Sequence, residues 1–330
     1  MILNQTDQTQ CFDDTGRIIP CSGTGQDGEI RSGRQWPEQR FTGRQDTVTD
    51  QLTGLVWPRD AGLSELPLSW QEAFDFVNDM NIREMFGLNR WRLPERSELF
   101  SLISHARINP AVVAPDQFRT LFNGYYWTAT PCVRYPRQAW YLHLGGGRIV
   151  KGMIHGSYMV WPVHDLRDGS QSVSGMSNPV EIRFQASQQI VSDQATGLTW
   201  LRDADILGKT VRWAEALSHI HRMNSEKWLG FQDWRLPNIR ELESLTDMTL
   251  HSPAIAARDW FKSIRPFYWS ATTSVYEPSY AWTLYSEDGN IGVGFKPGSE
   301  FHVWPVRTTQ AVEMVLKKED RKEIQTAAAV

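Results

Sequence analysis

The chain has 330 residues, of which 41% are hydrophobic and 22% are charged, and its formal net charge is −4. This length and composition are typical of a globular protein with two domains. The slight acidity argues against nucleic acid and membrane surfaces as partners. The sequence has no run of about 18 consecutive apolar residues and no signal-peptide pattern in residues 1–10. It therefore predicts a soluble protein without an export signal or a transmembrane segment.

Residues 1–47 form a leader segment around Cys11 and Cys21. Turn-forming residues lie between the two cysteines and predict a hairpin. A disulfide is geometrically feasible at this spacing; it would form in an exported protein, whereas a reducing cytosol would keep two thiols, and the sequence leaves both states open. Cys132 has no partner at a metal-site spacing and is expected to be a small, partly buried side chain.

Tryptophan is frequent, with 15 residues, and most of them recur at one period. The period is 143 residues at both ends of the repeat and 142 in its middle. Twelve of the 15 tryptophans are six positions written twice, so a whole domain is duplicated, as residues 48–164 and 191–307. The matching pairs are Trp57 and Trp200, Trp70 and Trp213, Trp91 and Trp234, Trp127 and Trp269, Trp140 and Trp282, and Trp161 and Trp304.

Each copy is expected to be an α+β module with two helices, a small antiparallel sheet and long loops. Asp-x-x-Thr-Gly-Leu-x-Trp at its start predicts a turn followed by a short strand. A first helix is expected from Ser69, which forms a capping box with Glu72, and from Arg212 in copy two. A second helix is expected to contain Pro94 or Pro237 in its first turn. The later Tyr-Trp, Ala-Trp and Val-Trp-Pro-Val segments predict antiparallel strands.

Two further segments complete the chain. Residues 165–190 are rich in Ser, Gly and Asn and predict a linker with a short strand at residues 180–184. Residues 308–330 carry a charged run after an apolar stretch and predict a helical tail.

The repeated motifs resemble a known family. Asp-x-x-Thr-Gly-Leu-x-Trp, Trp-Arg-Leu-Pro with a later Glu-Leu, Tyr-Trp-Thr/Ser-Ala-Thr and Ala-Trp occur in this order in residues 48–164 and 191–307. This order is similar to the bacterial DUF1566 family, also called the Legionella collagen-like protein C-terminal domain. Arg-Leu-Pro followed by Glu is also similar to formylglycine-generating enzymes and other C-type-lectin-like folds.

The resemblance implies a C-type-lectin-like fold, a location outside the cytoplasm or at the cell surface, and recognition of glycans or other surface components without chemistry. The chain departs from the family at Pro162 and Pro305, which stand where many members have a cysteine. A family disulfide is therefore not expected at that place.

The signature side chains are expected to be structural. Trp91 and Trp234 are expected in the core, because each aromatic side chain buries about 150–250 Å². Arg92 and Arg235 are expected to satisfy loop carbonyls or to pair with the glutamate six positions later.

Catalysis finds little support in the motifs. Residues 191–307 contain no cysteine, which excludes the paired-cysteine chemistry of formylglycine-generating enzymes there. The histidines of copy one have no counterpart in copy two, and neither copy has a hydrolase, metalloprotease, phosphate-loop or dinucleotide motif. We expect a protein that is not an enzyme and needs no cofactor.

The two copies differ most in the loop between Tyr-Trp and Ala-Trp, and loops on a fixed scaffold commonly carry function. In copy one this loop suits an anionic ligand such as a sulfated or carboxylated sugar, and in copy two it suits stacking on a neutral sugar or a cation. Alternatively, both loops are solvated and bind nothing. The candidate ligand-binding residues are Arg134, Tyr135 and Arg137 in copy one, and Tyr276, Glu277 and Tyr280 in copy two.

Glu277-Pro278-Ser279, with Glu287 and Asp288 further on, faintly resembles the calcium-dependent Glu-Pro-Asn motif of C-type lectins. Copy one lacks this sequence, and calcium requires several oxygen ligands. The sequence predicts a recognition protein for a glycan or cell-surface component. The alternative is a structural or accessory subunit of a larger protein complex. A concave polar loop surface favours the first, and a flat apolar patch the second.

Overall fold

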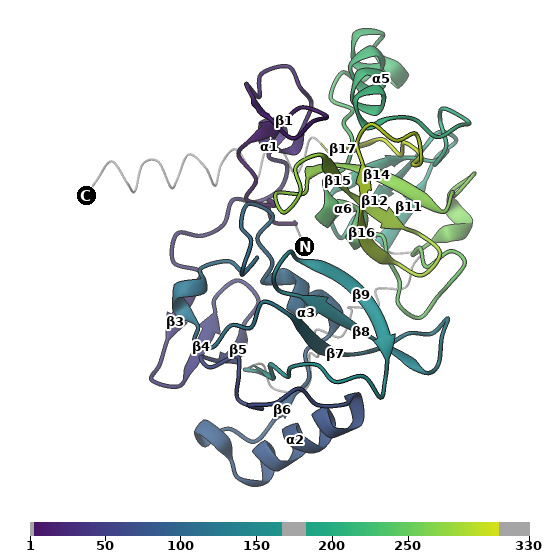
Figure 1. The fold of residues 1–330 in the computed structure, drawn as a ribbon. Helices are drawn as coiled ribbons and strands as arrows, with labels where there is room; N and C mark the ends of the chain where they lie inside the picture. Colours follow the sequence, from purple (N-terminus) through teal and green to yellow (C-terminus); the bar gives the residue numbers. More distant parts are fainter. Residues whose placement is uncertain (1–2, 167–182, 310–330) are drawn as a thin grey trace.

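The computed structural model describes residues 3–166 and 183–309, which form two modules and a leader that contacts both (Figure 1). The longest helices, α2 (Trp70–Ile82) and α5 (Trp213–Ser225), lie at opposite ends of the molecule, one in each module. None of the helices in these two ranges is long and apolar enough to cross a membrane. The predicted tail beyond residue 309 and most of the predicted linker lie outside the described residues.

The elements follow the sequence repeat. The leader holds β1 (Cys11–Phe12), β2 (Ile18–Ile19), α1 (Asp27–Ile30) and β3 (Phe41–Gly43). Module 1 holds β4 (Thr47–Asp50), β5 (Leu55–Pro58), α2, β6 (Trp91–Arg92), α3 (Arg96–Ser101), β7 (Tyr125–Pro131), β8 (Gln138–His143), β9 (Arg148–Met153) and β10 (Val163–Asp165). Module 2, with the strand before it, holds β11 (Phe184–Ala186), β12 (Ile190–Asp193), β13 (Leu198–Leu201), α5, α6 (Ile239–Ser244), β14 (Phe267–Thr273), β15 (Tyr280–Tyr285), β16 (Asn290–Phe295) and β17 (Val306–Thr308). Short 3₁₀ helices occur at Met85–Gly87, Pro115–Gln117, Trp228–Gly230 and Arg258–Trp260.

The two modules share a sheet, whereas the sequence predicted one small sheet in each. The shared sheet has six strands in the order β14-β15-β16-β9-β8-β7, next to sheets of order β3-β4-β5-β10-β6 and β11-β12-β13-β17. Strand β9 pairs antiparallel with β16, and Ile149 lies opposite Ile291, its own counterpart in the repeat. The modules are therefore related by a pseudo-two-fold axis at this pair. The pairing covers two strand edges that would otherwise expose unpaired N–H and C=O groups.

The helices begin close to where their caps predict. Ser69 forms the predicted capping box with Glu72 before α2, and α5 begins directly after Arg212. The second helices start later than predicted, because α3 begins at Arg96 and Pro94 lies before it. Capping explains the shift: the amide of the residue after the proline donates to the carboxylate of the glutamate in the first turn, at 2.7 Å in α3 and 2.9 Å in α6. The described residues contain five α-helices and are richer in strand than predicted.

The repeated tryptophans fill the core at matching positions. Trp91 and Trp234 are buried, and the indole Nε1 of each donates to a backbone oxygen six residues earlier, at 3.0 Å in both modules. Arg92 and Arg235 each donate to the carboxylate of the glutamate six residues later, with N–O distances of 2.7 Å. These residues fix the chain between β6 and α3 in module 1 and at the matching position before α6 in module 2.

The leader docks on module 2, although it is followed in sequence by module 1. Cys11 and Cys21 are joined by a disulfide, one of the two states that the sequence left open. The hairpin turn reaches the loop between β14 and β15, where a Cβ on Gly16 would lie 3.0 Å from the backbone of Ser279. A side chain at Gly16 would therefore push the hairpin away from module 2, and its φ of +84° also favours glycine. Cys132 is buried and free.

Candidate functional site

The predicted residues of copy one lie in the loop between β7 and β8, and one of them, Arg134, contacts module 2. The guanidinium of Arg134 forms an ion pair with Glu287, and Lys151 on β9 forms one with Asp288. The same two cations lie 5.4 and 5.6 Å from the centroid of the Tyr135 ring. Because each cation is paired with a carboxylate of module 2, the two charges are neutralised and leave little positive charge for an anionic ligand. The exposed ring of Tyr135 remains available for contact.

Tyr276 and Glu277 lie in the equivalent loop between β14 and β15, and Tyr280 is the first residue of β15. Tyr276 is 55% exposed and lies beside Gly146 in the β8–β9 turn of module 1. Glu277 accepts a hydrogen bond from the hydroxyl of Ser279 at 2.9 Å. Tyr280 packs against Phe295, with a distance of 5.3 Å between ring centroids. Of these two tyrosines, Tyr276 is therefore the more exposed to solvent.

The two loops do not form one cleft. The pseudo-two-fold axis passes between β9 and β16, so equivalent loops leave the shared sheet at opposite ends of its strands. The copy-one loop accordingly meets the β15–β16 turn through Arg134 and Glu287, and the copy-two loop meets the β8–β9 turn at Gly146. The structure therefore offers two separate candidate loops.

The calcium-like sequence has no metal-binding geometry. Glu287 and Asp288 are engaged by cations of module 1, and Glu277 bonds to its own loop. No three His, Cys, Asp or Glu side chains converge anywhere in residues 3–166 and 183–309 in a way that could hold a metal ion. Glu287 and Asp288 serve instead to join the two modules.

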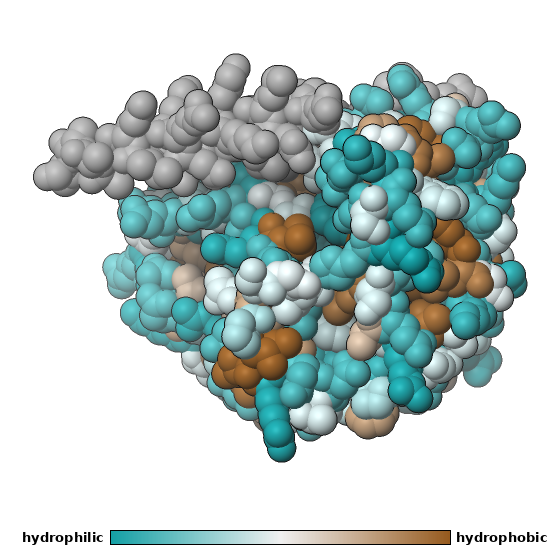
Figure 2. Space-filling model, turned by 90° about the horizontal axis from the view of Figure 1, so that it is seen from above, coloured by the Kyte–Doolittle hydropathy of each residue, from teal (hydrophilic) through white to brown (hydrophobic). Residues whose placement is uncertain are grey.

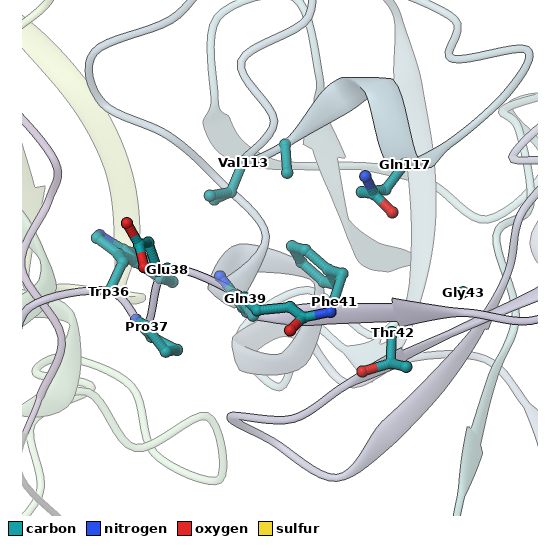
Figure 3. A pocket seen from close by; sticks show the side chains of 11 residues that line it. Trp36, Pro37, Glu38, Gln39, Phe41, Thr42, Gly43, Val113 and Gln117 are labelled. Atoms are coloured by element: carbon teal, nitrogen blue, oxygen red, sulfur yellow. The ribbon is translucent and has the colours of Figure 1, made fainter. Parts of the chain in front are cut away.

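A surface pocket of 440 Å³ lies between residues 36–43 of the leader and residues 113–117 of module 1. Figure 3 shows Trp36 and Glu38 toward one end, and Thr42 and Gln117 toward the other. Trp36 is held in place by the guanidinium groups of Arg40 and Arg240, at 4.4 and 5.0 Å from its ring centroid. Mixed aromatic and polar walls of this size are typical of small-ligand sites.

Sequence reasoning missed this pocket, although one signal pointed to it. Trp36 is one of only three tryptophans without a counterpart in the repeat. Because the duplicated cores do not need Trp36, this side chain can serve a contact that occurs only once in the molecule, such as the wall of this pocket.

Two buried ionisable groups lie where the leader meets module 2. The carboxylate of Asp27 accepts hydrogen bonds from the hydroxyls of Thr6 and Thr272, at 2.7 and 2.6 Å, and burial raises its pKa to about 6. Lys296 is fully buried, 4.2 Å from the ring centroid of Trp213, and its Nζ donates to the carbonyl of Asp13 at 3.2 Å. Burial lowers the pKa of Lys296 to about 7. The leader shields both groups from water, so they have no path to an external substrate.

His105 is buried at the seam of the two modules. Its ring lies between those of Phe100 and Trp282, at centroid distances of 5.6 and 5.4 Å. Neither ring nitrogen has a hydrogen-bond partner within the described ranges. Burial, assisted by the charge of Arg240, lowers the pKa of His105 well below its usual value. This environment stabilises a neutral ring in the core.

His105 should make the fold sensitive to acid. The unfolded chain takes up a proton on this histidine near pH 6.5, whereas the folded chain does not, so its contribution to stability is full above pH 6.5 and is lost as the pH falls. Asp27 acts in the opposite direction, because its raised pKa adds stability as the pH falls below about 6. We expect His105→Phe to lose less stability than the wild type between pH 7 and pH 5, measured by urea unfolding. His155→Gln, at an exposed position, is the control; equal pH dependence in all three proteins would contradict the assignment.

The comparison with known families identifies both modules. The model of the Lcl C-terminal domain matches residues 46–164 and again residues 189–307. These ranges start two residues before each predicted module and share its ends. No curated protein matches the chain.

Proposed function

Because this chain belongs to the family of the Lcl C-terminal domain and carries that domain twice, we propose that it is a non-enzymatic recognition protein. Its ligand is a glycan or another cell-surface component, bound by exposed loops of the two modules. The loops between β7 and β8 and between β14 and β15 supply the contacts.

One observation carries this proposal. Each module presents an exposed tyrosine on the same inter-strand loop, Tyr135 at 40% and Tyr276 at 55% exposure, while the repeated tryptophans around them are buried. Exposed aromatic rings on a rigid framework provide large contact areas for a ligand at low entropic cost. The cations near Tyr135 are paired with carboxylates, so ring stacking supports a neutral sugar better than an anionic one.

The surface seen in Figure 2 favours a ligand over a subunit interface. Hydrophobic residues on that face form separate patches between hydrophilic ones. A permanent subunit interface has a larger continuous apolar area. The accessory-subunit function is therefore the second outcome of the test.

The loop variants Tyr135→Ala/Arg137→Ala and Tyr276→Ala/Tyr280→Ala test the site. We expect at least a tenfold loss of binding, because truncation of an aromatic or arginine side chain at the centre of an interface often costs about 2 kcal/mol or more. The melting temperature should shift by only a few degrees, since surface substitutions change stability by about 0.5 kcal/mol. Binding is measured on a glycan array and by affinity capture from the native source.

Phe122→Ala is the matched control, because Phe122 is 54% exposed and lies outside both loops. Capture of a stable protein complex without any glycan signal would support the accessory-subunit function instead. Unchanged binding in both double variants would remove the loops from the site and leave the pocket at Trp36 as the next candidate.

A further inference from the structure

Strand β3 forms one edge of its sheet, and the pocket at Trp36 lies along this strand. In the order β3-β4-β5-β10-β6, the strands of the described residues flank β3 on one side only. Figure 1 shows β3 on the outer side of β4 and β5. Residues 36–43, which include all of β3, line one wall of the pocket. An edge strand presents unpaired N–H and C=O groups and can accept a further strand.

The pairing of β3 with β4 identifies the backbone groups that remain unpaired. The carbonyl of Arg40 accepts a hydrogen bond from the β4 side, and the amide of Arg44 donates one to it, each at 2.8 Å. Hydrogen-bonded pairs alternate with other pairs along an antiparallel ladder, so the backbone groups of Thr42 also face β4. The N–H and C=O groups of Phe41 and Gly43 therefore face away from β4.

These outward groups open toward the pocket, because both Phe41 and Gly43 line it. In the part of the chain that the structure describes, they have no hydrogen-bond partner. Phe41 is only 6% exposed, and a shielded backbone group without a partner costs free energy. The two residues repeat at about 7 Å, the repeat of two residues in an extended strand. An extended peptide carries donors and acceptors at the same repeat.

The opposite wall of the pocket limits what can pair with β3. Val113, Ala114 and Gln117 form this wall. Figure 3 shows Val113 and Gln117 on the side opposite Gln39 and Thr42. A space of 440 Å³ between two walls admits a single extended segment, whereas the edge of a folded sheet brings further strands with it. The occupant that fits is therefore a peptide segment rather than a second copy of the chain.

Charges of opposite sign lie at the two ends of β3. Glu38 lines the pocket before the strand begins. The guanidinium of Arg59 covers Gly43 at the other end and donates to the carbonyl of Arg44 at 2.9 Å. Neither Glu38 nor Arg59 forms an ion pair with another described residue. A peptide antiparallel to β3 would therefore be held best with an acidic residue toward its N-terminus and a basic residue toward its C-terminus.

The sequence repeat offers a variant of the opposite wall. Module 2 has the corresponding edge strand, β11, but Trp260 stands at the position of Gln117 and packs against the core. The backbone is held alike at both positions, because each carbonyl accepts from an arginine side chain, at 3.1 Å in module 1 and 3.0 Å in module 2. Gln117→Trp should therefore fill the pocket and leave the backbone in place.

We propose that the pocket at Trp36 binds an extended peptide segment of a partner protein, which adds to β3 as an antiparallel strand. The segment carries an acidic residue before a basic one along its chain. This site is separate from the loops of the proposed function and adds a second class of ligand.

The test selects peptides from a phage-displayed library of random linear dodecapeptides on the full chain, with Gln117→Trp as the counter-target. We expect the enriched peptides to carry an acidic residue N-terminal to a basic one. Their affinity, measured by fluorescence anisotropy of labelled synthetic copies, should fall at least tenfold in Gln117→Trp and several fold in Glu38→Gln. Methylation of the peptide's backbone nitrogens should weaken binding at alternate residues only, because alternate N–H groups point toward β3.

Glu226→Gln, which removes an exposed carboxylate of module 2, is the matched control for Glu38→Gln. Circular dichroism verifies that each variant is folded, and the methylation pattern decides the proposal even if Gln117→Trp does not fold. Peptide affinity should be unchanged in both double loop variants, so the losses of glycan and of peptide binding are measured separately.

Three results would overturn the strand-addition site. The first is that no peptide is enriched on the wild type over Gln117→Trp. The second is that the enriched peptides carry the reverse charge order. The third is that methylation weakens binding equally at every residue or at none. None of these results bears on glycan binding by the loops.

Discussion

Trp91→Ala is expected to lower the free energy of unfolding by about 3–5 kcal/mol, the cost of an aromatic cavity in a core. Trp91 is 2% exposed, and its ring packs edge-to-face on His164 at a centroid distance of 5.6 Å. The substitution also leaves the carbonyl of Met85 without the indole donor. The loss is measured by guanidinium unfolding followed by circular dichroism.

Trp228→Ala is the matched control, because the same side chain is removed where it is 40% exposed. Its backbone carbonyl still accepts the hydrogen bond from Trp234 after the substitution. We expect the control to lose much less stability than Trp91→Ala. Similar losses in the two variants would show that the repeated tryptophans are not the core of the modules.

Cys11→Ser/Cys21→Ser is expected to release the leader from module 2. A disulfide that closes a short loop stabilises a fold by about 2–4 kcal/mol. The hairpin it closes covers Lys296, whose amine is fully buried against the carbonyl of Asp13. In the double variant we expect Lys296 to react with an amine-directed reagent at pH 8 and the leader to become sensitive to protease.

Two controls accompany this experiment. Cys132→Ser removes the free cysteine outside the hairpin and should leave Lys296 unlabelled. Lys209, which is exposed, should be labelled equally in every protein. If Lys296 stays unlabelled in the double variant, the hairpin remains docked without its disulfide.

Many elements of each module could be predicted from the sequence, because the same short-range interactions occur in both copies. The Ser69 capping box lies at the start of α2, and Arg92 and Arg235 pair with glutamates in both modules. These interactions are local, and a spacing of three to six residues reveals them. The start of α3 was misplaced by two residues, because the carboxylate that caps it stands after the proline rather than before it.

The relation between the modules could not be predicted, because it depends on contacts far apart in the chain. Nothing in the pattern of β9 distinguishes a free strand edge from one that pairs with β16. The leader likewise reaches module 2 through a contact between Asp27 and Thr272, which are 245 residues apart. Short-range periodicity carries no information about either interface.

The candidate loops were located by their divergence, but their chemistry was only partly anticipated. Arg134 was expected to attract an anion, and instead it pairs with Glu287 across the module interface. Tyr135 and Tyr276 are exposed on those loops.

Equilibrium dialysis of the array-selected ligand, with mass spectrometry of the ligand on both sides of the membrane, tests the recognition function most directly. We expect saturable retention of the ligand by the protein and recovery of the ligand chemically unchanged. Recovery of a converted product that depends on the protein would contradict a non-enzymatic function, and equal ligand concentrations on both sides at saturating protein would contradict recognition itself.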